Sequence, residues 1–286
     1  MSAAHAGSST PSTCSVLVCT YEAPRELELV LAALSRQSRL PTEILIADDG
    51  SGDATRAVID AWRPRIGAPV HHIWQRDVGY RKARVMNEAA RRATGAHIIM
   101  LDGDSFPHRR WVEDHWRAAD GRKVLCGRRV KLGPGLSAQV TVDDVLAGQF
   151  DSVWNGRLLA SWLRRDTQRL SLGVRLPVPL ARALHPRPRK LMGVNFSLPR
   201  GVFEAVNGFN EEWVVYGHED RDLELRLLRS GQRFEALLNR GIVFHMWHRE
   251  RERTETTHAL LAAAESSTAT RCERGLVGGP PFDPNT

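Results

Sequence analysis

The chain has 286 residues, of which 42% are hydrophobic and 26% are charged. This size and composition exclude a disordered or fibrous protein and favour one domain of α/β size that carries an insertion. The apolar runs are far shorter than the roughly 20 residues of a membrane-spanning helix, and residues 1–13 lack the cationic start and apolar stretch of a secretory signal. We therefore expect a cytoplasmic protein with a flexible N-terminal segment at 1–13.

The positive charge is concentrated in one segment. Residues 157–190 contain nine Lys or Arg and one acid, and subtracting this local charge of +8 from the net charge of +7 leaves −1 for the rest of the chain. This distribution disfavours a nucleic-acid-binding fold, so we expect no nucleic-acid partner. The four cysteines show no metal-binding spacing and are expected to be reduced thiols.

The first half of the chain, residues 14–130, alternates short apolar runs with amphipathic ones. This pattern predicts βαβ units and a largely parallel sheet. We expect strands at 15–19, 43–47, 70–74, 97–101 and 124–130, and helices after Pro24, at 53–62 and at 81–93.

The regular pattern is lost over residues 131–190, the basic insertion, which contains several prolines. It returns in residues 191–250, where we expect strands at 191–198 and 241–245 and helices from 200 and at about 219–230. The C-terminal tail, residues 251–286, predicts one helix and a mobile end.

Polar residues follow three of the predicted strands. They are Thr20-Tyr21-Glu22, Asp48-Asp49-Gly50-Ser51 and Asp102-Gly103-Asp104. In open α/β sheets, ligands bind outside the carboxyl ends of the strands, so these clusters should converge. Two carboxylates as close as Asp102 and Asp104 suit Mg²⁺ or Mn²⁺ holding a diphosphate, although an Asp pair can also cap a turn before Pro107.

With these motifs in place, the chain resembles family 2 glycosyltransferases. The donor-binding segments of that family are matched at 14–21, 43–53 and 77–87. Residues 192–197, 206–211 and 217–227 are similar to the C-terminal region shared by galactosyltransferases and chondroitin-type polymerases. The resemblance implies an α/β GT-A fold, a Rossmann-like sheet flanked by helices with a basic helical insertion. It also implies a nucleotide-sugar donor and inversion at the anomeric carbon.

The resemblance also implies roles for the residues of the donor half. The nucleoside would be bordered by Thr20, Tyr21 and Glu22, although Glu22 stands where the family usually has another residue. Asp49 would accept the base N–H and select uracil, while Asp48 serves the turn. Arg81 or Arg84 would meet the diphosphate, unless both are solvated surface charges.

In the same resemblance, Asp104 would bind the metal directly, and Asp102 would hold the ribose or a metal-bound water. Asp220 would be the general base and Glu219 would orient the acceptor, although acidic residues are favoured in a first helical turn anyway. Because a helix N-terminus lowers a carboxylate pKa, we expect Asp220 to be ionised at pH 7. Gly193 and Asn195 would line the donor-sugar pocket.

Relatives place a metal-binding histidine at the end of the strand predicted at 241–245. His245 and His248 both qualify, and side chains three positions apart on an extended strand face opposite ways, so we expect only one of them to bind. A nitrogen ligand beside carboxylates favours Mn²⁺ over Mg²⁺. Two ordinary surface histidines are the alternative.

Residues 157–190 have the composition of an interfacial amphipathic segment. An anionic membrane surface, an acidic glycan and a protein partner are the alternative binding partners, and a merely solvated loop is the alternative to binding. A membrane would place the enzyme on its inner face beside a lipid-linked acceptor. The predicted function is metal-dependent sugar transfer, with a UDP-sugar as donor and a glycan or other glycoconjugate as acceptor. The alternatives to sugar transfer are a haloacid-dehalogenase-type phosphatase with Asp102 as nucleophile and a basic nucleic-acid-binding module.

Overall fold

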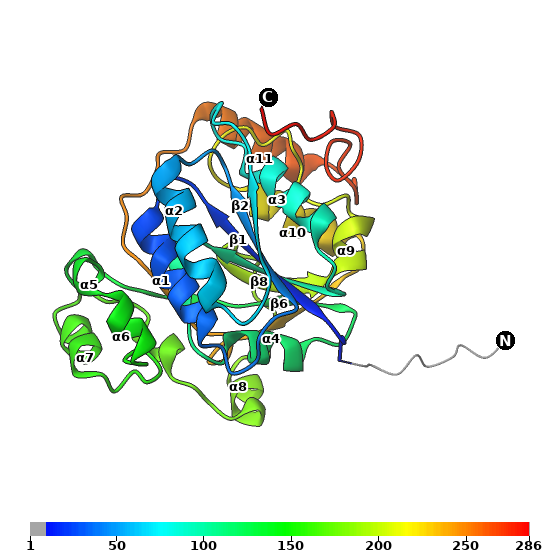
Figure 1. Ribbon diagram of the computed structural model, residues 1–286. Coiled ribbons are helices and arrows are strands. Elements are labelled where there is room, and N and C mark those ends of the chain that lie inside the picture. Colours follow the sequence, from blue (N-terminus) through cyan, green and yellow to red (C-terminus); the bar gives the residue numbers. More distant parts are fainter. Residues whose placement is uncertain (1–9, 286) are drawn as a thin grey trace.

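A seven-stranded sheet forms the centre of the computed structural model, which describes residues 10–285 (Figure 1). The strand order is β3-β2-β1-β4-β8-β6-β9, and a second, three-stranded sheet has the order β5-β10-β7. Within the large sheet, β8 is antiparallel to both of its neighbours, whereas the other pairs are parallel. The largely parallel sheet expected from the first half of the chain is therefore confirmed.

The strands of the large sheet are β1 (Cys14–Thr20), β2 (Glu43–Asp48), β3 (Val70–Trp74), β4 (His97–Asp102), β6 (Lys123–Cys126), β8 (Asn195–Pro199) and β9 (Arg233–Ala236). Those of the small sheet are β5 (Ser105–Pro107), β7 (Arg129–Lys131) and β10 (Val243–His245). The single strand expected at 124–130 is wrong. Its residues form two strands in different sheets because the chain leaves the large sheet after Cys126, where the Gly127 N–H donates to the Asn195 carbonyl.

Helices cover both faces of the large sheet. The helices of the first part of the chain are α1 (Pro24–Ser35), α2 (Asp53–Trp62), the 3-10 helix η1 (Arg63–Arg65), α3 (Lys82–Arg92) and α4 (Trp111–Ala118). Further on are α9 (Arg200–Ala205), α10 (Glu219–Arg229) and α11 (Glu255–Ser266). One core lies under α1, α2 and α4, and the other lies under α3, α9 and α10. Strands β1 and β2 alternate between the two cores and are buried on both faces.

The basic insertion folds into short helices, which lie to one side of the sheet in Figure 1. They are α5 (Pro134–Gln139), α6 (Val142–Leu146), α7 (Gly156–Leu163), the 3-10 helix η2 (Leu170–Gly173) and α8 (Val178–Leu184). Arg36 of α1 holds this region through two hydrogen bonds to Asp151, 3.1 and 2.8 Å long. None of the helices within residues 10–285 combines the length and apolarity needed to cross a bilayer.

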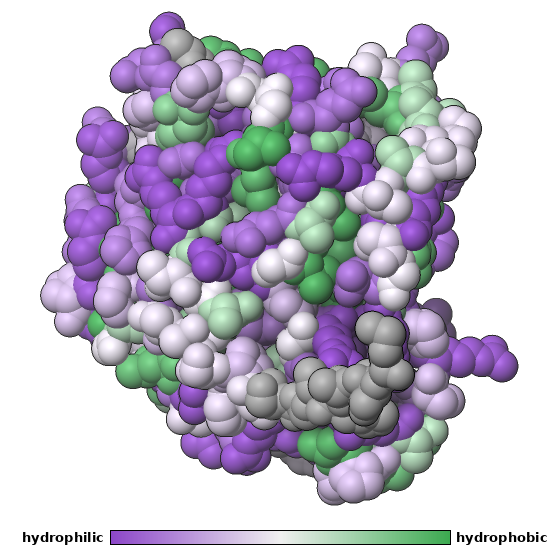
Figure 2. Space-filling model, turned by 90° about the vertical axis from the view of Figure 1, so that its right-hand side faces the viewer, coloured by the Kyte–Doolittle hydropathy of each residue, from purple (hydrophilic) through white to green (hydrophobic). Residues whose placement is uncertain are grey.

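The tail contains the expected helix, α11, but the expected mobile end is wrong for the residues that the structure describes. The segment after α11 packs against the sheet-covering helices: Arg91 of α3 donates to the carbonyl of Gly275, and Asn207 donates to the carbonyl of Cys272. All four cysteines are free and three are buried, which confirms the prediction of reduced thiols. Figure 2 shows the side of the molecule away from α5–α7; it is mostly hydrophilic, with small separate hydrophobic areas.

Asn195 joins the two sheets and is fully buried. Its Oδ1 atom accepts hydrogen bonds of 3.0 Å from Trp111 Nε1 and His115 Nε2. Its Nδ2 atom donates to the carbonyls of Arg128 and Gly241 at 3.0 and 2.7 Å. The expectation that Asn195 lines a sugar pocket is therefore wrong, because its amide group is enclosed and fully bonded within the core.

Asn195→Ala should lower the free energy of unfolding by about 3 kcal/mol, because it leaves two buried carbonyls and an indole N–H without partners. Urea denaturation monitored by circular dichroism measures this change. Asn210→Ala is the control and should cost less than about 1 kcal/mol, since among residues 10–285 the Asn210 side chain bonds only to Glu212, two residues further on. Equal destabilisation by the two changes would contradict the role of Asn195.

Candidate active site

The polar ends of β1, β2 and β4 meet at one edge of the sheet, as the sequence predicts. Thr20 is in register with Asp48, and Cys19 is in register with Asp102 on the other side of β1. Because these strands are parallel, the residues that follow them project from the same edge.

Asp49 is buried at this edge and has two hydrogen-bond donors. Its Oδ1 accepts from Gln75 Nε2 at 2.6 Å, and its Oδ2 accepts from the backbone N–H of Arg81 at 2.9 Å. Burial raises the pKa of Asp49 to about 6, although both hydrogen bonds act in the opposite direction. Asp48 holds the turn instead, through the Ser51 N–H at 2.8 Å, as expected. Gln75 was not predicted; its position directly after β3 is the signal that could have identified it.

Thr20, Tyr21 and Glu22 form the rim around the turn that follows β2. The Thr20 carbonyl accepts from the Asp49 N–H at 3.0 Å, and the Tyr21 hydroxyl donates to Asp77 at 2.9 Å. Glu22 has a left-handed backbone with φ of 45°, and its Oε1 accepts from the Gly52 N–H at 2.8 Å. The three residues thus lie beside Asp48–Gly52, where the resemblance places the nucleoside.

Lys82 connects the two halves of the site. Its ammonium lies 2.9 Å from Asp102 Oδ1 and 3.3 Å from Glu219 Oε1. Burial alone would lower the pKa of Lys82, but the two carboxylates outweigh it and raise this pKa well above the usual range. Lys82 has no role that the sequence alone predicts. It is the first residue of α3, directly after the predicted Arg81, and only the folded chain shows that it reaches Glu219.

Asp220 lies next to this ion cluster at the N-terminus of α10. The backbone N–H of Gly193 donates to Asp220 Oδ2 at 2.9 Å. A Cβ atom on Gly193 would lie 3.5 Å from Lys82 Nζ and 3.7 Å from Asp220 Cβ, so the glycine keeps this space open. The expectation that the helix terminus lowers the pKa of Asp220 is wrong. Burial and the neighbouring Glu219 raise its pKa to about 6.

Asp104, His245 and His248 form a group suited to a divalent metal, with ligand atoms all within 4.8 Å of one another. The Nε2 atoms of His245 and His248 lie 3.5 and 3.3 Å from Asp104 Oδ2. The expectation that the two histidines face opposite ways is wrong, because β10 ends at His245 and the residues up to His248 no longer follow strand geometry. One carboxylate and two imidazoles are a fitting donor set for Mn²⁺.

Gly103 separates Asp102 from Asp104 and lets the two carboxylates contact different groups. Its N–H donates to the Cys19 carbonyl at 2.7 Å, and a Cβ atom at this position would lie only 2.7 Å from the same oxygen. The backbone can therefore pass close to β1 at Gly103, with Asp102 facing Lys82 and Asp104 facing the two histidines. Asp102 lies outside the three-residue metal group.

Other predicted residues have different surroundings. Arg84 donates to the carbonyl of Asp283 and lies over the ring of Phe282, so it contacts the C-terminal segment. The Arg81 guanidinium donates to the Arg76 carbonyl.

Two family models match the chain. The model "Glycosyl transferase family 2" matches residues 15–160, and the model "N-terminal domain of galactosyltransferase" matches residues 183–249. The chain belongs to glycosyl transferase family 2. The resemblance seen in the sequence is thus confirmed, and the matches support neither a phosphatase nor a nucleic-acid-binding module.

Curated relatives are identical to this family 2 member at about a quarter of the aligned positions. Validoxylamine A glucosyltransferase of Streptomyces hygroscopicus subsp. limoneus is 27% identical over 230 residues, covering 76% of this chain and 48% of the relative. Chondroitin synthase of Pasteurella multocida is 28% identical over 246 residues, covering 81% of this chain and 24% of the synthase. The chain therefore spans about half or less of the length of these relatives.

Solved structures confirm the fold. A mannosyltransferase from Pyrobaculum calidifontis, in complex with GDP-Man and Mn²⁺, has a TM-score of 0.53 at 16% identity, with 91% of this chain and 70% of that chain covered. S. aureus TarS has a TM-score of 0.51 at 15% identity, covering 82% of this chain and 37% of TarS. These neighbours are GT-A glycosyltransferases, so the predicted fold class is confirmed.

The raised pKa of Asp220 predicts a pH-dependent effect of Asp220→Asn on stability. A carboxyl group whose pKa is raised in the folded state stabilises the protein below its unfolded pKa of 3.8, and this contribution is lost as the pH rises through about 6. Asp220→Asn has no titrating group at this position and so does not lose this contribution. Its free energy of unfolding relative to that of wild type should therefore rise by about 2 kcal/mol between pH 4 and pH 7.5.

Urea denaturation of both proteins at several pH values measures this difference. Asp60→Asn, on the exposed surface of α2, is the control and should show no such trend. A difference between Asp220→Asn and wild type that does not change with pH would contradict a raised pKa at Asp220.

Proposed function

We propose that this protein transfers a sugar from a nucleotide-sugar, specifically a UDP-sugar, to a hydroxyl group of a glycan or other glycoconjugate, in a metal-dependent and inverting reaction. The observation that carries the proposal is the Lys82 bridge, because it brings Asp102 of the donor half to Glu219 of the acceptor half. Membership of family 2 supports the same reaction class.

In this proposal, Asp49 recognises the nucleobase. Its carboxylate is buried and oriented by Gln75 and by the Arg81 backbone, and it would accept an imide N–H such as that of uracil. Tyr21 and Glu22 border the nucleoside, and Arg81 or Arg84 would approach the diphosphate. Arg84 would have to leave its contact with the C-terminal segment to do so.

Asp104, His245 and His248 would hold the divalent ion, and we propose Mn²⁺ because of the two imidazole ligands. When bound, the ion supplies positive charge that stabilises the departing diphosphate. Asp102 remains bonded to Lys82 and faces the ribose. The solved mannosyltransferase with GDP-Man and Mn²⁺ supports a metal of this kind in the same fold.

Asp220 is the general base. Its Oδ2 atom is held by the Gly193 N–H, which leaves Oδ1 to accept the proton of the acceptor hydroxyl. A pKa of about 6 leaves the group mostly ionised at pH 7 while keeping it basic enough to take a proton. Glu219, held by Lys82, orients the acceptor, and the open space at Gly193 leaves room for the sugar that is transferred.

Asp104→Ala should abolish the Mn²⁺-dependent part of UDP binding, whereas Asp220→Asn should keep it and lower sugar transfer about 100-fold or more. Isothermal titration with UDP, with and without Mn²⁺, measures binding. Release of UDP from a panel of UDP-sugars measures turnover. Activity equal to wild type in either variant would contradict this division of roles.

We also propose that the protein acts at the cytoplasmic face of a membrane. Trp154 and Leu163 are 77% and 73% exposed at the two ends of α7, and Trp162 is also exposed. Arg164 and Arg165 follow directly and are exposed. Exposed aromatic and aliphatic side chains beside arginines are typical of a surface that binds anionic lipid.

Replacing both Trp162 and Leu163 by Ser should weaken binding to phosphatidylglycerol vesicles about tenfold. Vesicle co-sedimentation at low and high salt measures this affinity. The matched control replaces Leu228 and Val277, which are exposed elsewhere, by Ser and should bind like wild type. No vesicle binding by wild type, or equal losses in the two double variants, would contradict the membrane surface.

A further inference from the structure

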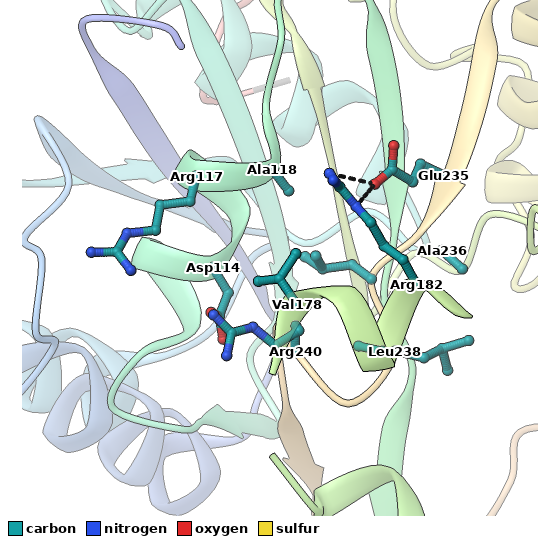
Figure 3. Close-up of a pocket in the computed structure, with 11 residues that line it drawn as sticks. Asp114, Arg117, Ala118, Val178, Arg182, Glu235, Ala236, Leu238 and Arg240 are labelled. Atoms are coloured by element: carbon teal, nitrogen blue, oxygen red, sulfur yellow. Dashed lines mark hydrogen bonds and ion pairs between the residues drawn. The ribbon is translucent and has the colours of Figure 1, made fainter. Parts of the chain in front are cut away.

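Three arginines of the basic insertion have carboxylate partners. Arg157 pairs with Asp144 at 2.8 Å, Arg175 pairs with Asp114, and Arg182 pairs with Glu235 at 3.1 Å. Figure 3 shows the last of these contacts in a pocket between α8 and the strand β9, where Arg240 also pairs with Asp114. These arginines are neutralised and hold the insertion to the core.

Four arginines on or near β7 lack such a partner: Arg128, Arg129, Arg169 and Arg189. Within residues 10–285, no carboxylate lies within ion-pair distance of any of them, and the same is true of the exposed Arg164, Arg165 and Arg187. The Arg128 guanidinium donates to a single carbonyl, that of Gly127. The Nε atom of Arg129 is buried and has no hydrogen-bond partner. An unpartnered buried guanidinium nitrogen is costly unless a ligand satisfies it.

The backbone brings these four arginines together. Lys131 and Gln168 exchange hydrogen bonds of 3.1 and 2.8 Å, which places Arg169 beside β7. The Arg128 carbonyl accepts from Asn195 Nδ2, so β7 begins next to the segment that leads from Arg189 through Gly193 to Asn195. In addition, burial and the positive charges of Arg189 and Arg169 lower the pKa of Arg128, so the guanidinium groups of Arg128, Arg169 and Arg189 share one region. Arg129 is the first residue of β7, and its positive charge acts on His248 and Tyr216 on the metal side of the site.

This region adjoins both parts of the proposed active site. Strand β7 pairs with β10, with Lys131 opposite the metal-group residue His245. At the other side, Arg189 is four residues before Gly193, whose N–H holds the proposed base Asp220. The four arginines therefore lie beside the place where an acceptor must present its hydroxyl group.

We propose that Arg128, Arg129, Arg169 and Arg189 bind an oxyanion carried by the acceptor, either a sugar carboxylate or a lipid-linked phosphate, and so select an acidic acceptor. This inference rests on the proposed function. Planar guanidinium groups match carboxylate and phosphate oxygens with paired hydrogen bonds. The diphosphate of the donor already has the metal group for its charge, which leaves these arginines to the acceptor.

The test compares two double variants that each remove two exposed charges. Arg169→Gln with Arg189→Gln removes the outer part of the subsite, and Arg56→Gln with Arg233→Gln is the matched control on α2 and β9. Arg128→Gln is a further single variant. The probes are an oligogalacturonate hexamer, geranyl diphosphate and the neutral sugar maltohexaose, each titrated by calorimetry, with UDP and Mn²⁺ in a separate titration.

Wild type should bind one of the two acidic probes more tightly than maltohexaose, and the first double variant should lose at least about tenfold of that affinity. The control pair should change it little, and both pairs should bind UDP with Mn²⁺ like wild type. Which acidic probe binds identifies the source of the oxyanion, carboxylate or phosphate. Arg128→Gln should show the same selective loss, with an unchanged melting temperature indicating an intact fold.

Three results would overturn the inference: no preference of wild type for either acidic probe, equal losses in the two double variants, or a parallel loss of UDP affinity. The last result would assign the arginines to the donor. Failure of wild type to bind UDP with Mn²⁺ tests the proposed function separately, because binding of the acidic probes does not require the nucleotide.

Discussion

The site depends on one mostly buried cation between two acidic groups. Lys82 joins Asp102, at the end of β4, to Glu219, at the start of α10, and these carboxylates are separated by more than a hundred residues of chain. Asp102, Glu219 and Asp220 would repel one another in this low-dielectric region without the ammonium between them. Removing one member of such a buried group typically costs about 3–5 kcal/mol, since it leaves an uncompensated charge. Lys82 thus allows the carboxylates of Asp102, on the donor side, and Glu219, on the acceptor side, to lie close together.

The geometry around Lys82 also separates the chemical tasks. Asp102 and Asp104 are two residues apart, but the close approach of Gly103 to β1 lets one face Lys82 and the other face the histidines. Among residues 10–285, Asp220 forms no ion pair and lies outside the metal group, and burial raises its pKa to about 6. Asp220, whose charge is the least compensated, is the proposed proton acceptor. Asp102, Asp104 and Glu219 have compensating cations or a metal group, and their proposed roles are to bind the donor and orient the acceptor.

Much of the fold and part of the site could be predicted from the sequence. Apolar runs identify β1, β2, β3 and β4, because buried parallel strands read as continuous hydrophobic stretches, and the polar residues after them define the binding edge. Contacts between distant segments could not be predicted this way. Lys82 reads as an ordinary helix residue until Glu219 is placed beside it, and Arg84 reads as a binding residue until the C-terminal segment covers it. The pKa of Asp220 depends on burial, which no local pattern reports. The two histidines meet because β10 ends at His245, whereas their expected opposite orientation required the strand to continue to His248.

The central claim is that Lys82 occupies the space between Asp102 and Glu219 while a metal binds separately at Asp104, His245 and His248. Anomalous X-ray diffraction from crystals grown with Mn²⁺ and UDP tests this directly, because it locates manganese independently of the protein. We expect one strong manganese peak within bonding distance of Asp104 and both histidines, with Lys82 still between Asp102 and Glu219. A manganese peak between Asp102 and Glu219, with the Lys82 side chain displaced, would contradict it.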